Sequence, residues 1–275
     1  MSYGLQTKFN RLKSIIRSRV RCQMHPREIY NLLLDSASTD TLVKEIIIGL
    51  TWTYCQAEGI GLCMSPGQPT RTLPWSGTLV NQKIKDLAPW LKSWDSYQAT
   101  IGMAVINAVI NASSPLIAAS APLYPKVSAN LAVFEHFLPL IRRKKVVVIG
   151  RYPGLSQYEQ EIDLQVLERQ PTSQDFPDTA CEYILPEADW VFLTATSIVN
   201  KTFPRLVELS QNAKLVLMGP TVPWLPELRE MGIDYLAGIA VTQKELLRQT
   251  IAEGGGTRIF ETGVQYRVLE LASFT

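Results

Sequence analysis

Lys145-Val-Val-Val-Ile-Gly-Arg-Tyr-Pro-Gly154 is the stretch that decides the fold of this chain. Four consecutive β-branched residues, Val146 to Ile149, form a short apolar run that ends at a glycine. Such a run is typical of a strand buried on both faces, as in a parallel sheet. The two glycines bracket a tight loop, and we expect a helical segment over 155–161. Strand, glycine loop and helix together form a unit whose backbone N–H groups can face an anion.

The chain after this stretch repeats the same unit. Further short apolar strands are expected, at 163–167, 190–193, 214–218 and 235–240, with amphipathic helices over 199–209 and 243–251 and a closing segment over 259–268. This alternation predicts an α/β domain, a Rossmann-like parallel sheet with crossover helices on both faces. The proline-rich break at 121–125 is the expected linker, which gives a second domain over 121–275.

The chain before the linker has a different pattern, which predicts a smaller α+β domain over 1–120. A basic amphipathic helix over 5–21 has two interpretations, a solvated surface helix or a membrane-surface or transit segment. Pro26 opens a second helix. Strands over 44–54 and 59–63 are expected to form a hairpin that turns near Glu58 and Gly59, and helices are expected over 84–91 and 96–112.

Composition narrows the class of protein. The chain has 275 residues and a net charge of +2, which is too small to indicate a nucleic-acid partner. No apolar run is long enough to span a bilayer, and the N-terminus lacks the apolar core of a secretory signal. Four scattered cysteines without a CxxC motif favour a reduced, cytoplasmic protein with free thiols. A homodimer would be unsurprising, because many soluble proteins form two-fold pairs.

Asn107 and Asn111 stand out within the helix over 96–112, which is apolar almost all round. They are four residues apart and therefore share one face. Because buried carboxamides need hydrogen-bond partners, the pair either ties down a neighbouring loop or lines a polar cleft. Gly59 and Gly61 in the returning strand indicate a bulge, or close approach by another backbone or a ligand.

Ligands of Rossmann-like sheets bind beyond the carboxyl ends of the strands, where the strand order reverses. The loops at that edge are rich in hydroxyls, glycines and prolines, and they supply most of the candidate site. Together with the asparagine pair and the hairpin turn, the candidate ligand-binding residues are Glu58, Gly59, Asn107, Asn111, Gly150, Arg151, Tyr152, Gly154, Thr194, Thr196, Ser197, Asn200, Gly219, Pro220 and Thr221.

Several common sites are absent from the sequence. The dinucleotide fingerprint would need a middle glycine, whereas this loop places Tyr152 and Pro153 where a pyrophosphate needs room, so NAD or FAD is not expected. P-loop, HExxH and G-x-S-x-G motifs are missing, and no Cys/His spacing indicates a metal site. A hard-metal site with oxygen ligands such as Glu58, Asp189 and Asp234 stays open.

Three segments carry a family resemblance. They are Ala188-Asp-Trp-Val-Phe-Leu-Thr-Ala-Thr-Ser, Val216-Leu-Met-Gly-Pro-Thr-Val-Pro-Trp and Gly232-Ile-Asp-Tyr-Leu-Ala-Gly. They resemble the "putative heavy-metal chelation" domain family of uncharacterised prokaryotic proteins, and residues 10–115 resemble the domain that commonly precedes it. The resemblance implies an enolase N-terminal-like domain joined to a Rossmann-like domain, with a cleft between them. It implies no catalytic residues.

Three functions are compatible with these observations. The first is the binding or handling of a metal ion or metal complex in the interdomain cleft. The second is an enzyme that acts on an anionic or nucleotide-like metabolite at the carboxyl ends of the strands, with Glu58, Glu168, Tyr152 or Cys63 as titratable groups. The third is an assembly or regulatory protein with a vestigial cleft. Few cysteines and histidines argue against soft-metal chelation by side chains alone.

Overall fold

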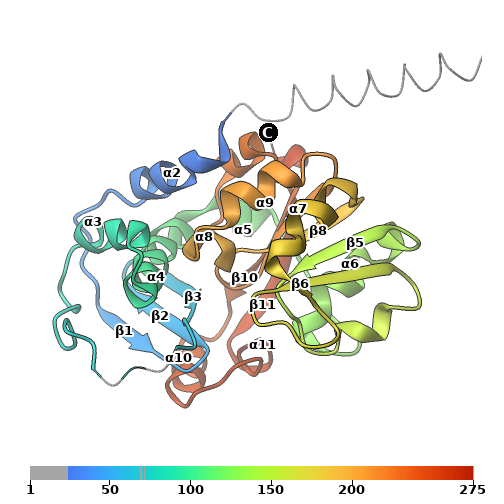
Figure 1. Ribbon diagram of the computed structural model, residues 1–275. Helices are drawn as coiled ribbons and strands as arrows, with labels where there is room; N and C mark the ends of the chain where they lie inside the picture. Colours follow the sequence, from blue (N-terminus) through green and yellow to red (C-terminus); the bar gives the residue numbers. More distant parts are fainter. Residues whose placement is uncertain (1–23, 69, 71, 275) are drawn as a thin grey trace, which may run out of the picture.

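A computed structural model describes residues 24–68, 70 and 72–274. The helix expected over 5–21 lies outside the described residues. Figure 1 shows a small sheet with helices α2 to α4 beside a larger sheet that carries the remaining helices. This arrangement confirms the predicted fold class, a Rossmann-like α/β part preceded by a smaller α+β part.

The larger sheet has eight strands in the order β4-β11-β10-β9-β8-β5-β6-β7. In chain order they are β4 (Ala121–Pro122), β5 (Lys145–Ile149), β6 (Asp163–Glu168), β7 (Phe176–Pro177), β8 (Trp190–Thr194), β9 (Lys214–Met218), β10 (Tyr235–Val241) and β11 (Val264–Glu270). Six neighbouring strands of the sheet, β10, β9, β8, β5, β6 and β7, are parallel, whereas β11 runs antiparallel to both β10 and β4. The sheet is therefore parallel with an antiparallel edge, which the sequence pattern did not show.

Strand β5 is buried on both faces, as its run of β-branched residues predicts. Val147 belongs to the apolar core on one face of the sheet, and Val146 and Val148 belong to the core on the other. All three are at most 1% exposed. This alternation follows from the two-residue period of a strand, and it requires helices on both faces.

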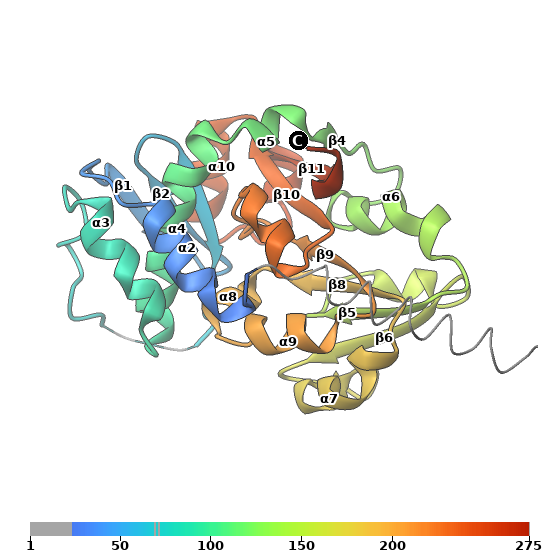
Figure 2. The same ribbon diagram turned by 90° about the horizontal axis from the view of Figure 1, so that it is seen from above.

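Those helices are divided between the two faces, as Figure 2 shows for α6 and α9. Helices α6 (Ala132–Ile141), α10 (Lys244–Ala252) and α11 (Ile259–Thr262) bury their apolar residues in the core around Val148. Helices α5 (Pro115–Ala119), α7 (Cys181–Ile184), α8 (Thr196–Val199) and α9 (Phe203–Leu209) pack on the opposite core.

Two helix predictions in this part were only partly right. The helix expected over 199–209 begins only at Phe203, as α9, because the chain turns at Lys201 with a φ of 70°; Val199 is the last residue of the preceding α8. The segment expected to be helical over 155–161 forms only a 3-10 turn, Leu155–Tyr158.

Within the described residues, the small part has one antiparallel sheet and three α-helices, besides short 3-10 turns. The sheet contains β1 (Glu45–Ile48), β2 (Trp52–Gln56) and β3 (Ile60–Met64), and the helices are α2 (Ile29–Ser36), α3 (Ile84–Leu87) and α4 (Ser96–Ser113). The single strand expected over 44–54 was wrong, because the chain turns between β1 and β2. A side chain at Gly49 in this turn would lie 2.6 Å from the carbonyl oxygen of Ile251.

Polar contacts join the small part to the large one. The guanidinium of Arg248 on α10 donates to both carboxylate oxygens of Glu45 on β1. The ammonium of Lys201 donates to the carbonyls of Leu91 and Val199, both at 2.7 Å, and burial lowers the pKa of this lysine. Because apolar residues of both parts also share one core, the two parts pack as one body. The boundary between residues 120 and 121 stays a prediction.

Within the described residues, none of the helices combines the length and the apolar character needed to cross a membrane.

Candidate functional site

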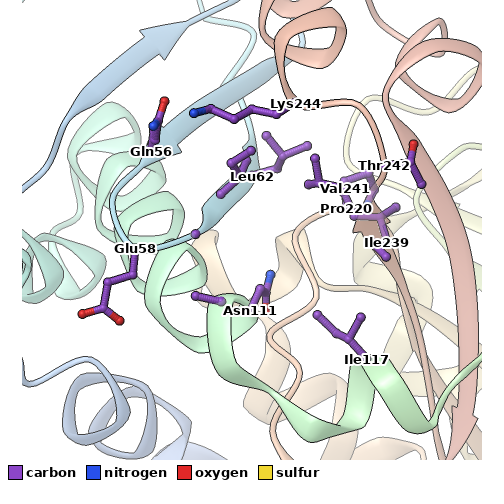
Figure 3. Close-up of a pocket in the computed structure, with 14 residues that line it drawn as sticks. Gln56, Glu58, Leu62, Asn111, Ile117, Pro220, Ile239, Val241, Thr242 and Lys244 are labelled. Carbon is purple, nitrogen blue, oxygen red and sulfur yellow. The ribbon is translucent and has the colours of Figure 1, made fainter.

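A pocket of about 380 Å³ lies where the two parts meet. The large part contributes the carboxyl end of β10 and the loop after β9, and the small part contributes the β2–β3 turn and the C-terminal end of α4 (Figure 3). Its lining combines apolar and polar side chains: Gln56, Glu58, Gly59, Ile60, Leu62, Asn111, Ala112, Ile117, Pro220, Ile239, Ala240, Val241, Thr242 and Lys244.

Glycines bring the β2–β3 turn and β3 against helix α4. A Cβ atom at Gly61 would lie 2.0 Å from the carbonyl oxygen of Ala104, and one at Gly59 would lie 2.7 Å from the Cβ atom of Ala112. The expected close approach of another backbone is therefore real, and that backbone belongs to α4. The contact fixes one wall of the pocket.

The two asparagines of α4 have different roles. The amide nitrogen of Asn107 donates to the carbonyl oxygens of Leu62 and Thr221, both at 3.0 Å, so this fully buried side chain joins β3 to the loop after β9. Its Oδ1 atom has no hydrogen-bond partner among the described residues. Asn111, one turn later, lines the pocket and accepts a long hydrogen bond of 3.4 Å from the backbone of Trp224. The pair thus fulfils both alternatives, a loop tie and a pocket wall.

Two charged side chains lie at the pocket. Lys244, the first residue of α10, extends across it toward Gln56 (Figure 3). Glu58 accepts a hydrogen bond of 2.5 Å from the hydroxyl of Thr41, and its carboxylate points away from Lys244.

The loop after β9 reaches the pocket over a buried tryptophan. Trp224 is 1% exposed, and its indole nitrogen donates to the carbonyl oxygen of Ile239 at 3.2 Å. A Cβ atom at Gly238 would lie 2.9 Å from three atoms of this indole. The ring therefore sets the position of the loop that carries Pro220 relative to β10.

A second group of candidate residues lies at the point where the strand order reverses, between β5 and β8. Gly150 and Gly219 have positive φ angles of 94° and 106°. The hydroxyl of Tyr152 would lie 3.8 Å from a Cβ atom at Gly219. Burial raises the pKa of Tyr152 to about 12. The tyrosine side chain thus packs at the carboxyl end of the sheet, beside Gly219.

Arg151 is committed to the protein itself. Its guanidinium forms an ion pair with Asp175 and thereby lowers the pKa of that carboxyl group to about 2. Its backbone N–H donates to Glu168 at 2.9 Å, and Glu168 also accepts from the backbone of Arg169. These contacts order the loops after β5 and β6, so they support a structural role for Arg151.

The polar residues of α8 and its following turn also bond locally. Ser197 donates to the carbonyl oxygen of Thr194 at 2.7 Å, and the hydroxyls of Thr194 and Thr196 lie 3.0 Å apart. Asn200 accepts from the backbone and the hydroxyl of Thr202, which orders the entry to α9. Gly154 opens the 3-10 turn with a φ of 85°.

The structure thus divides the predicted site residues into separate groups. Glu58, Gly59, Asn111 and Pro220 line the pocket, and Asn107 and Thr221 lie behind it. Asn200 lies in the turn between α8 and α9. The remaining candidates lie around the strand-order reversal: Gly150, Arg151, Tyr152, Gly154, Thr194, Thr196, Ser197 and Gly219. Lys244 and Gln56 were not predicted, although the end of β10 was recognised as part of the ligand-binding edge. Lys244 and Gln56 meet at the pocket because the small part packs against α10. No pattern in the sequence predicts this packing.

Neither thiol of the small sheet is poised as a nucleophile or metal ligand. Cys55 and Cys63 are buried, and burial raises the pKa of both to about 12. Within residues 24–68, 70 and 72–274, no three His, Cys, Asp or Glu side chains are grouped as a metal ion requires. These donors do not fit a bare metal ion held by side chains alone.

Comparisons with known proteins place the chain in a family. Two family models, both described as "Putative heavy-metal chelation", match residues 30–110 and 132–270. A crystal structure of a DUF364-family protein of unknown function from Desulfitobacterium hafniense is 32% identical, with a TM-score of 0.78 over 89% of this chain and 98% of that one.

Two further proteins are similar. A structure from Pyrococcus horikoshii, 23% identical with a TM-score of 0.71, shares the fold over 90% of this chain and 100% of its own. An uncharacterized protein from Methanocaldococcus jannaschii is 29% identical over 171 residues, which are 59% of this chain and 62% of that relative, less than two thirds of its length. On the match over 132–270, which is half of its length, this chain belongs to the DUF364 family, described as "Putative heavy-metal chelation".

Proposed function

We propose that this protein binds a metal in the form of a complex with a small organic chelator, in the pocket between its two parts. The observation that carries the proposal is the lining of that pocket. It offers amides, a hydroxyl and one amine beside apolar walls, with Glu58 as its only carboxylate among the described residues. Such a mixture is typical of sites for small organic molecules.

The family description supports the binding of a metal. The small number of metal-binding side chains supports a chelator as the source of its ligands. A bare transition-metal ion would need several His, Cys, Asp or Glu ligands from the chain, and no three such side chains are grouped among the described residues. A chelator would supply those ligands, and the protein would then recognise the organic surface of the complex. A cytoplasmic location, a homodimer and the absence of a nucleic-acid partner belong to the same proposal.

An enzyme acting on an anionic metabolite is the second candidate. It is favoured by the position of the pocket at the carboxyl end of β10, the edge at which α/β proteins place ligands. Glu58 and Lys244 are the titratable groups of the lining. Turnover of a bound metabolite without metal would select this alternative.

Native mass spectrometry with elemental analysis tests the proposal on untagged protein purified without chelators. We expect a bound organic mass together with stoichiometric metal. Asn111→Ala in the pocket should lower the occupancy, whereas Arg151→Ala at the strand-order reversal should leave it unchanged. Occupancy that depends on Arg151 and not on Asn111 would place the ligand at the other site and contradict the proposal.

A further inference from the structure

Lys244 brings a positive charge to the pocket that the described residues neutralise only weakly. Its one ion pair is with the adjacent Glu245, at 3.8 Å, and the Glu245 side chain is 79% exposed. A pair this long and this exposed is largely screened by water. The ammonium group therefore remains available to a ligand.

The other nearby acids are occupied elsewhere. Arg248 is the main partner of Glu45, because its guanidinium donates to both carboxylate oxygens at 2.7 and 2.9 Å and lowers the pKa of Glu45. Lys244 lowers the pKa of Glu45 by a smaller amount. Glu58 accepts from Thr41 and points away from Lys244 in Figure 3. The pocket thus presents the ammonium group of Lys244, a side chain that is 42% exposed, without a second carboxylate directed at it.

The remainder of the lining completes the chemical description of the ligand. Gln56 lies beside the end of Lys244 and Asn111 lies across the pocket from it, so amide groups are available at two points (Figure 3). Between them, Leu62 and Ile239 form apolar walls. The volume of about 380 Å³ is near the low end of the roughly 300–1,000 Å³ typical of ligand pockets.

We propose that the ligand is a small organic anion with an apolar portion, and that Lys244 binds its carboxylate or phosphate group. This inference rests on the proposed function and specifies its ligand. A lysine ammonium is a point charge that serves either anion. A free divalent cation would be repelled by the same group, so the metal would enter only within an anionic complex.

Isoleucine methyl groups in the pocket provide the assay. Ile60, Ile117 and Ile239 line the pocket, so their ¹³C-labelled methyl signals report on its occupation by nuclear magnetic resonance. The full-length protein would be titrated with citrate, Fe³⁺–citrate and glycerol 3-phosphate, and with glycerol and ZnCl₂ as neutral and cationic controls. The comparison of citrate with glycerol 3-phosphate identifies the preferred anionic group.

We expect at least one anion to shift these methyl signals, and glycerol and Zn²⁺ to leave them unchanged. Lys244→Gln should weaken binding roughly tenfold to a hundredfold, as expected for loss of a charged hydrogen bond, and Lys244→Arg should retain most of it. The methyl spectrum without ligand shows whether each variant is folded.

Three results would overturn the inference: no shift with any anion, equal binding by Lys244→Gln, or shifts with Zn²⁺ alone. The second would reject the role of Lys244 and leave the pocket as an anion site. The third would leave the pocket as a ligand site and reject both the anion and the chelator of the proposed function. Anion-induced shifts confined to Ile149 and Ile198, which lie near the strand-order reversal, would instead reject the pocket and with it the proposed function.

Discussion

Replacement of Asn107 by alanine is the perturbation whose effect the structure specifies best. The change removes two buried hydrogen bonds, to the carbonyl oxygens of Leu62 and Thr221. An unpaired buried group costs about 1–3 kcal/mol, so the two carbonyls together cost about 2–6 kcal/mol. The change also removes the Oδ1 atom of Asn107, which is buried without a partner. Removal of that atom stabilises the folded state by about 1–3 kcal/mol, so the net loss in the free energy of unfolding is about 1–3 kcal/mol.

Urea unfolding followed by circular dichroism measures this free-energy difference. Asn111→Ala is the matched control, since it removes one long hydrogen bond from a partly exposed side chain one helical turn away, and it should cost less than about 1 kcal/mol. Asn107→Asp should destabilise more than Asn107→Ala at neutral pH, because a carboxylate would face two carbonyl oxygens without a donor. An Asn107→Ala protein within about 0.5 kcal/mol of the wild type, or a larger loss with Asn111→Ala, would refute this reasoning.

Three further predictions concern stability and reactivity. Gly238→Ala should destabilise the protein by about 1–3 kcal/mol in urea unfolding, because the added Cβ atom would overlap the buried indole of Trp224. Cys63 should resist iodoacetamide at pH 8 until urea is added, as seen by peptide mapping, because the pKa of about 12 leaves about one thiol in 10,000 ionised. Glu45→Gln should reduce stability at pH 7, and by a smaller amount at pH 3. The pair with Arg248 lowers the pKa of Glu45, so its stabilising effect is complete above the ordinary value of 4.5 and is lost as the pH falls through the lower folded value. A difference that persists unchanged at pH 3 would contradict the ion-pair explanation.

The local patterns of the sequence were sufficient to predict most strands of the large sheet. Val146 to Ile149 have the residue types of a strand buried on both faces, and both faces are covered. The division of the expected strand over 44–54 was not visible, because it depends on Gly49 packing against Ile251, about two hundred residues later in the chain. Contacts of this kind are decided by tertiary packing, and local propensity does not report them.

The site was predictable only in part, for the same reason. The spacing of Asn107 and Asn111 predicted a polar role, but only the position of the loop after β9 shows which of them is tied and which faces the pocket. Lys244 has the appearance of an ordinary solvated helix residue in the sequence. It gains a candidate role because α10 packs beside the small sheet, whose β2 supplies Gln56 to the same pocket.

We propose that the pocket between the two parts, and not the strand-order reversal, holds a metal complex. Anomalous diffraction at the iron absorption edge, from crystals of the full-length protein grown with Fe³⁺–citrate, tests it most directly. We expect an anomalous peak inside the pocket, with the citrate between Lys244 and Asn111. A peak among Gly150, Thr194 and Gly219, or iron coordinated by protein side chains alone, would contradict it.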